Sequence, residues 1–469
     1  MVSFVVYDLI FLAIFTLATV FFLYKRRENL KRQGLLYLYR TNIGLKIMDW
    51  TAKKFNRILK PMQYVIIASG YLLMIGAIWV VIRIVSLYTK PEIIRAIKIP
   101  PVLPLFPYAT DLFKIDFLPP FYFTYWIIII AVIAISHEFA HGIFARLNKI
   151  RVHSTGFGFL GPFLAAFVEP DEKQMNKSKK FPQLSILAAG TFANVVMTVL
   201  FALILWLFFA SAFTPAGINF NAYPNAIIDT NSIRSVNGVL IENIEDASEL
   251  ASEGDKLTEI SIGENKFLLP GDNLRKAIDR KIERIIVFED APAVRADFKG
   301  PILEINGKKI LNREILQEEI LKYKPGEEIE IETIIDEERK TVSLELSERE
   351  EKAFLGIGFA EPERGRITSL IFSITKIVKE PFIYYEPIWN SNFAWFVYNL
   401  LWWLVLINFS VALINMLPVG IFDGGRFFYL TIWGITKSEK IGRKAFTLAT
   451  WAIVAIIIWL TFQWIRAVF

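Results

Sequence analysis

Long uninterrupted apolar runs dominate the pattern of hydrophobic and polar positions along this chain. Each run is long enough for a helix that crosses a bilayer, which needs about 20 apolar residues. The chain is therefore expected to be a polytopic α-helical membrane protein with about six transmembrane helices. The expected spans cover residues 2–24, 62–88, 121–147, 183–213, 393–417 and 445–464.

One long segment between spans, residues 214–365, has the composition of a soluble α/β module. Residues 329–335 and 341–346 alternate between apolar and polar side chains, a pattern typical of half-buried strands. Residues 311–323 favour a short helix. We therefore expect a folded domain inserted between the fourth and fifth spans.

The order of elements in this module resembles a PDZ domain. Along the chain, the elements are Ala291-Pro292-Ala293, the hairpin Ile305-Asn306-Gly307-Lys308, a helix, and the turn Lys324-Pro325-Gly326-Glu327. The resemblance predicts one clear PDZ-like copy at residues 281–349. Residues 229–280 are either a degenerate first copy or an insertion.

Two further segments fit neither a span nor the soluble module. Residues 156–168 are apolar, but the segment is short and rich in glycine, which favours a re-entrant β element inside the membrane. Residues 25–60 are basic, and they form either an amphipathic helix on an anionic leaflet or a solvated loop. The expected domains are N-terminal helices (1–121), a first core part (122–213), the PDZ-like region (214–365) and a second core part (366–469).

Composition limits the available chemistry. The chain of 469 residues is 54% hydrophobic and contains no cysteine, which excludes disulfides and thiolate metal ligands. The net charge is +6, yet 32 of the 46 acidic residues lie between Asp229 and Glu363, so the bases concentrate in short loops. We interpret these loops as topology signals and expect no nucleic-acid partner.

The basic loops also predict an orientation in the cell membrane. Residues 25–60 carry eleven Lys and Arg, residues 148–182 carry six and residues 418–444 carry five, against four in the longer loop of residues 90–120. Because short basic loops favour the cytoplasm, the amino terminus and the PDZ-like region are expected outside it. The third and fifth spans then both run inward.

The candidate chemistry lies in the third span, at His137-Glu138-Phe-Ala-His141. Two histidines four residues apart share one helix face and can bind Zn²⁺, with the glutamate as a candidate base. Such a pattern also arises by chance, and a single histidine in an apolar helix is usually structural. Ionisable groups are costly in hydrocarbon, however, which favours the metal site. His153 is expected to be a surface residue.

Asp423 is the expected third ligand, because it follows the inner end of the fifth span and two imidazoles leave zinc short of a protein ligand. The alternative for its Asp-Gly-Gly sequence is a plain turn. Glu138 would take a proton from the attacking water and pass it to the leaving amine. Asn194 either donates to the developing oxyanion or bonds a neighbouring helix.

Taken together, these motifs resemble the site-2 proteases, which are intramembrane zinc metalloproteases. The resemblance includes the His137–His141 motif, residues 158–170, Ala189-Gly190 with Asn194, and Asn415…Pro418…Asp423-Gly424. Thr191 departs from it, because many members have proline there. The resemblance implies regulated cleavage of single-span membrane proteins, metal ligation by His137, His141 and Asp423, and catalysis by Glu138. It also implies that the re-entrant β element presents an extended substrate.

A transporter or ion channel and a catalytically silent membrane scaffold are the alternative classes of protein. In a transporter or ion channel, the three side chains of the His137–His141 motif would relay protons or metal ions, but no inverted repeats are evident. A catalytically silent membrane scaffold would not need both Glu138 and Asp423. A PDZ-like module also leaves open contact with peptides or substrates outside the membrane.

Overall fold

The computed structural model describes residues 4–33, 36–90, 94, 99–115, 118–160, 163–335, 338–360 and 379–468. The chain divides into two compact units. Unit 1 comprises Met1–Leu205 with Phe396–Phe469, and unit 2 comprises Trp206–Trp395. The predicted domain boundary after residue 365 lies outside the described residues.

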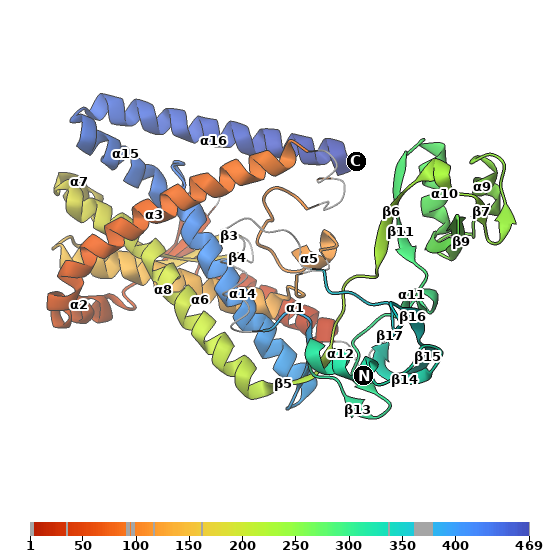
Figure 1. The fold of residues 1–469 in the computed structure, drawn as a ribbon. Helices are drawn as coiled ribbons and strands as arrows, with labels where there is room; N and C mark the ends of the chain where they lie inside the picture. Colours follow the sequence, from red (N-terminus) through yellow and green to blue (C-terminus); the bar gives the residue numbers. More distant parts are fainter. Residues whose placement is uncertain are drawn as a thin grey trace. The chain divides into compact units, whose positions relative to one another are not determined.

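Six helices among the described residues are long and apolar enough to cross a membrane, which confirms the predicted polytopic helical architecture (Figure 1). Two of them begin one to two turns before the predicted apolar runs, since a helix continues through polar residues at the membrane interface. The six are α1 (Phe4–Lys25), α3 (Asn56–Tyr88), α6 (Phe123–Leu147), α8 (Lys180–Ala212), α14 (Ser391–Asn415) and α16 (Glu439–Val468).

The core of unit 1 lies where α3, α6 and α8 meet a shorter helix, α15 (Asp423–Thr436). Ile66, Ala145, Ala188 and Phe427, one from each of these helices, are all 0% exposed. Small residues on α6 and α8 let the helices approach closely, which is the usual basis of helix packing in a bilayer. This packing holds α6 against α8 at the depth of the His137–His141 motif.

A four-stranded antiparallel sheet also belongs to unit 1, with strand order β1-β2-β3-β4. Its strands are β1 (Leu30–Gln33), β2 (Leu36–Thr41), β3 (Val152–Leu160) and β4 (Phe163–Pro170). The shorter helices of unit 1 are η1 (Arg27–Asn29), α2 (Leu45–Lys54), α5 (Ala109–Leu112) and α7 (Glu172–Lys177). The glycine-rich segment is thus a β-hairpin, and its place at membrane depth stays a prediction.

Neither alternative expected for residues 25–60 describes this segment fully. Among the described residues of this segment, the helices before α3 are the end of α1, the single turn η1 and the ten-residue α2, and β1 and β2 form a hairpin. The second strand of this hairpin, β2, also pairs with β3, for example Tyr39 with Phe157. The reason is tertiary: β3 offers an unpaired edge, and the alternating Leu and Tyr side chains of β2 suit a pleated surface.

Unit 2 is built from β-sheets with short helices. The six-stranded sheet has the order β6-β11-β10-β9-β7-β8, the four-stranded sheet has the order β13-β12-β14-β15, and two pairs are β16-β17 and β18-β5. The strands are β5 (Phe213–Ile218), β6 (Asn225–Asp229), β7 (Ser235–Val236), β8 (Val239–Leu240), β9 (Leu257–Ile262), β10 (Asn265–Pro270), β11 (Arg284–Glu289), β12 (Glu304–Ile305), β13 (Lys308–Lys309), β14 (Glu328–Ile335), β15 (Glu338–Glu345), β16 (Ser347–Arg349), β17 (Lys352–Phe354) and β18 (Ile383–Pro387). The helices are η2 (Thr230–Ser232), α9 (Asp246–Leu250), α10 (Gly271–Asp279), α11 (Pro292–Arg295) and α12 (Arg313–Ile320).

The same arrangement of four strands and a helix occurs once in each of the two larger sheets of unit 2. The strands β8-β7-β9-β10 with α9 have the order and pairing of β13-β12-β14-β15 with α12. The side-chain oxygen of Asn237 accepts from the backbone of Glu259 at 3.0 Å, and that of Asn306 accepts from Glu330 at 2.8 Å. Residues 229–280 therefore contain a repeat of the later fold. The PDZ-like identity of both copies stays a prediction.

Candidate metal centre

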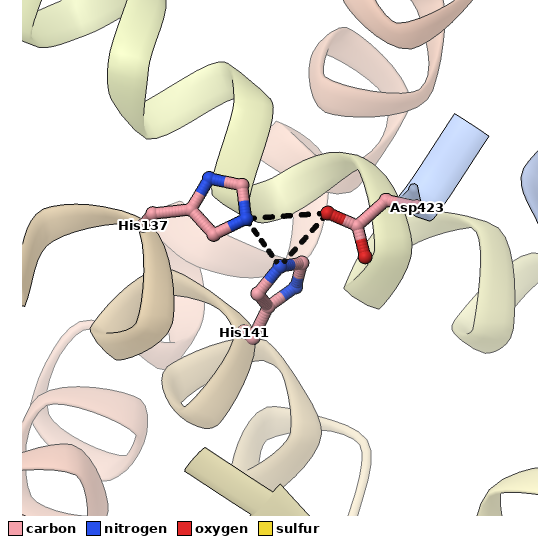
Figure 2. Close-up of side chains that lie close together, drawn as sticks. All are labelled: His137, His141 and Asp423. Carbon is pink, nitrogen blue, oxygen red and sulfur yellow. Dashed lines mark hydrogen bonds and ion pairs between the residues drawn. The ribbon is translucent and has the colours of Figure 1, made fainter. Parts of the chain in front are cut away.

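The imidazoles of His137 and His141 lie side by side in the core of unit 1 (Figure 2). Both project from one face of α6 because they are one helical turn apart. His137 is 7% exposed and His141 is 9% exposed. Their Nε2 atoms are 3.0 Å apart and both face Asp423 (Figure 2).

Asp423 is the first residue of α15 and follows the turn that ends α14. The turn is tight, since a Cβ at Gly424 would overlap the backbone of Met416. This close approach aims the Asp423 carboxylate at α6, which a plain solvated turn would not do. The Oδ2 atom lies 3.2 Å from Nε2 of His137 and 3.3 Å from Nε2 of His141.

Groups from α8 hold the opposite nitrogens of both imidazoles. His141 Nδ1 lies 2.7 Å from the carbonyl oxygen of Ile186, so it carries a proton and donates to that oxygen. The Asn194 amide lies 3.2 Å from His137 Nδ1, while its oxygen is buried without a hydrogen-bond partner. Exchanging the amide oxygen and nitrogen lets the oxygen accept from His137 Nδ1. Both Nε2 lone pairs then point into the space between the three side chains.

The donor set fits a divalent cation. Among the described residues, the His137, His141 and Asp423 ligand atoms form a group that could hold a metal ion, all within 4.8 Å of one another. Tetrahedral Zn²⁺ with bonds of ~2.0–2.1 Å places its ligand atoms about 3.3 Å apart, close to the observed separations. Two neutral imidazoles and one carboxylate are also an ordinary ligand set for zinc.

Gly190 on α8 closes one side of this space. A Cβ at Gly190 would overlap Nε2 of His141 and lie 2.6 Å from Nε2 of His137. A side chain there would fill the space in front of the ligand atoms. The sequence indicated only that this glycine lets helices approach closely, so its relation to the imidazoles comes from the structure.

The Glu138 carboxylate is fixed by the sheet of unit 1. The backbone N–H of Val168 on β4 donates to Glu138 Oε2 at 2.9 Å. Because β4 is the last strand of its sheet, this N–H lies on an edge that carries no further strand among the described residues. Glu138, the neighbour of His137 on α6, is therefore hydrogen-bonded to the edge strand of this sheet.

The structure brings together the predicted side chains of His137, His141 and Asp423, with Glu138 and Asn194 adjacent to them through sequence or hydrogen bonding. His153 lies elsewhere, 45% exposed and 3.3 Å from Asp171. The Ile186 carbonyl and the Val168 N–H were not predicted, because no sequence signal marks a backbone group for such a role. The roles of the five predicted residues stay predictions.

Comparison with known proteins gives two matches. The model of peptidase family M50 matches residues 125–460, a range that includes all five predicted site residues. An uncharacterized protein of Methanocaldococcus jannaschii is 28% identical over 415 residues, which cover 86% of this chain and 80% of that protein.

Proposed function

The chain belongs to peptidase family M50, the site-2 protease family, and from that membership we propose that it is a zinc-dependent endopeptidase that cleaves transmembrane segments of membrane-anchored proteins. Family membership and six apolar helices support a multi-pass intramembrane metalloprotease. The choice of zinc, the substrate class and the roles of single residues are our proposal.

The observation that carries the proposal is the triangle of His137 Nε2, His141 Nε2 and Asp423 Oδ2, with sides of 3.0, 3.2 and 3.3 Å. Asp423 is nearly three hundred residues from the histidines in sequence. Three donor atoms with unshared electron pairs directed at one another are unfavourable unless a cation or protons lie between them. Zinc bound there would supply a Lewis acid that makes water reactive near neutral pH.

The side chains of the site have separable tasks. Glu138 accepts a proton from the attacking water and returns it to the leaving amine, and its contact with Val168 holds the carboxylate in place for this. Ile186 and Asn194 orient the two imidazoles through their Nδ1 atoms. Both imidazoles are buried, and burial strengthens electrostatic interactions with them.

The position of β4 as the last strand of its sheet supports an extended substrate. Alternate backbone groups of an edge strand point outward and can pair with a peptide by strand addition. On β4 the outward N–H of Val168 already reaches Glu138. A substrate segment on this edge would present its peptide bonds beside the proposed base. A transmembrane helix must therefore unwind locally before it is cut, since helical peptide groups are hydrogen-bonded internally.

We also propose the sidedness and the partners. The basic short loops favour the cytoplasm, which leaves unit 2 outside it and the active site toward the cytoplasmic side. The natural substrates are then single-span membrane proteins whose outer domains have been removed. The PDZ-like region would exclude bulky outer domains or contact substrates as a peptide-binding module. Rejection of uncut precursors by a variant that lacks residues 214–365 would contradict the steric role.

The decisive experiment uses the purified full chain in liposomes with a single-span substrate. We expect cleavage by the wild type, loss with a chelator and recovery on adding Zn²⁺. Glu138→Gln should retain bound zinc but lose cleavage, and His137→Ala should lose both. His153→Ala is the matched control and should cleave normally, because His153 lies outside the site. Cleavage that survives both the chelator and Glu138→Gln would refute the mechanism.

A further inference from the structure

The first span contains a buried carboxylate that the proposed mechanism does not use. Most side chains of α1 are exposed at its surface, and its buried residues are Asp8 and Thr19. Asp8 is 1% exposed. An acid within an apolar span is costly and therefore needs partners that compensate for its burial.

Asp8 has four such partners from outside α1. The backbone N–H groups of Phe123 and Thr124 donate to its carboxylate at 2.8 and 2.9 Å. The hydroxyl of Thr124 donates at 2.5 Å, and so does the hydroxyl of Tyr108. Both carboxylate oxygens are therefore hydrogen-bonded twice.

Two of these donors are the first backbone amides of α6, the helix that carries the His137–His141 motif. The first four N–H groups of a helix have no intrahelical acceptor, and the residue before α6, Tyr122, gives no side-chain cap. Asp8 thus caps α6 from another helix. Its negative charge also lies at the positive end of the helix dipole.

The cap is enclosed by aromatic side chains. The ring of Phe123 packs on Phe11 and Phe15 of α1, at centroid distances of 5.4 and 5.3 Å. Phe123 is 2% exposed and Trp126 is 3% exposed. Where water is excluded, hydrogen bonds to a charged group are strong and the geometry they impose is stiff.

We infer that Asp8 is a positioning residue for the proposed protease, because its carboxylate sets the axial position and rotation of α6 and so of His137, Glu138 and His141. Thr124 and His137 are thirteen residues apart on one continuous helix, about 20 Å at 1.5 Å per residue. A rotation of the helix at its capped end turns the imidazoles by the same angle. Displacements of about 1 Å at a reacting group can cost 10²-fold in rate.

The test compares Asp8→Ala, Asp8→Asn and the control Thr19→Val in the full chain in lipid nanodiscs. Alanine removes every acceptor. Asparagine keeps one oxygen, which can accept from one of the two backbone amides and from the hydroxyl beside it, while its NH₂ group faces the other amide and cannot accept from it. Thr19→Val changes the other buried residue of α1. The cleavage readout rests on the proposed function, whereas the hydrogen-exchange readout does not depend on it.

The first readout is hydrogen exchange of peptides from α6, measured with the metal chelated. For Asp8→Ala we expect exchange at least tenfold faster in the first turn of α6 and unchanged exchange in α3 and α8. The second readout is cleavage, where kcat should fall at least tenfold with KM within about twofold. Asp8→Asn should give exchange and kcat between those of Asp8→Ala and the wild type, because it keeps an acceptor for one of the two amides, and Thr19→Val should match the wild type.

Unchanged exchange in α6, or equal acceleration across α3, α6 and α8, would overturn the inference, since the carboxylate would then have no role or only a general structural one. A change in KM with an unchanged kcat would also overturn it. A wild-type protein that cleaves no substrate would count against the proposed function, while the exchange result would still decide whether Asp8 fixes α6.

Discussion

Gly190 and His141 lie so close across the contact between α8 and α6 that a Cβ on the glycine would overlap Nε2 of the histidine. The same Cβ would lie 2.6 Å from Nε2 of His137. The hydrogen atom at this position therefore keeps the space in front of both proposed ligand atoms open. The close contact between α8 and α6 and the space for a metal ion therefore both require glycine at position 190.

Gly190→Ala should abolish or strongly weaken zinc binding, because the added methyl group occupies the space between the ligand atoms. Overpacking a tight site costs about 1–3 kcal/mol, which corresponds to a loss of affinity of roughly 5- to 150-fold. Metal content of the purified protein and the zinc dependence of cleavage measure this. Gly76→Ala on α3 is the control, since a Cβ there would meet only Leu413 at 3.4 Å. Equal zinc affinity in both variants would contradict the prediction.

Asn194→Ala should lower zinc affinity, since the amide oxygen no longer accepts from Nδ1 of His137. Loss of such a partner typically costs 10- to 100-fold in metal affinity or activity. Asn194→Asp should retain most of the affinity, because a carboxylate accepts the same proton. Titration of the metal-free protein with Zn²⁺ measures both. If Asn194→Ala bound zinc normally and lost 10²–10³-fold in kcat, the oxyanion role expected from the sequence would be favoured instead.

Asp423→Asn should reduce zinc affinity at least tenfold, because an amide is a weaker ligand than a carboxylate for a zinc ion and leaves the site without its negative charge. The control is Asp171→Asn, which removes a carboxylate 3.3 Å from His153 and outside the site. Competition with a chelator of known affinity gives the zinc dissociation constants of the two variants. Normal binding by Asp423→Asn would remove this residue from the ligand set.

The later copy of the repeat in unit 2 should show a pH-dependent ion pair. Lys308 and Lys322 contact the Glu319 carboxylate at 2.7 and 2.8 Å, and these hydrogen bonds hold the pKa of Glu319 below its usual range. A lowered folded-state pKa contributes stability that is present above the unfolded pKa, about 4.3, and is lost as pH falls through the folded pKa. Glu319→Gln should therefore lower stability by ~1 kcal/mol at pH 7.

Thermal unfolding of the wild type and Glu319→Gln between pH 7 and pH 3.5 checks this. The difference in Tm should persist down to about pH 5 and shrink below about pH 4.3. Glu318→Gln is the control, since that neighbouring side chain is exposed. A difference that is constant over the whole range would show that the ion pair does not cause it.

The helical framework could be predicted from the sequence because lipid allows few alternatives. A run of about 20 apolar residues that crosses hydrocarbon satisfies all its own backbone groups as a helix. The pairing of β2 with β3 was missed, since strand partners far apart in sequence are chosen by the available edges. Asp8 was missed for a related reason: its partners at Tyr108 and Thr124 are remote in sequence.

The sequence by itself determined that His137 and His141 share a helix face, because helical spacing is a local property of the backbone. It also indicated which acid follows the inward end of the fifth span. Only the tertiary structure decided how far that carboxylate lies from the imidazoles, which backbone groups orient them, and that Gly190 leaves room between them. Those distances depend on how α6, α8 and α15 pack, and packing is a sum of many contacts that no short motif contains.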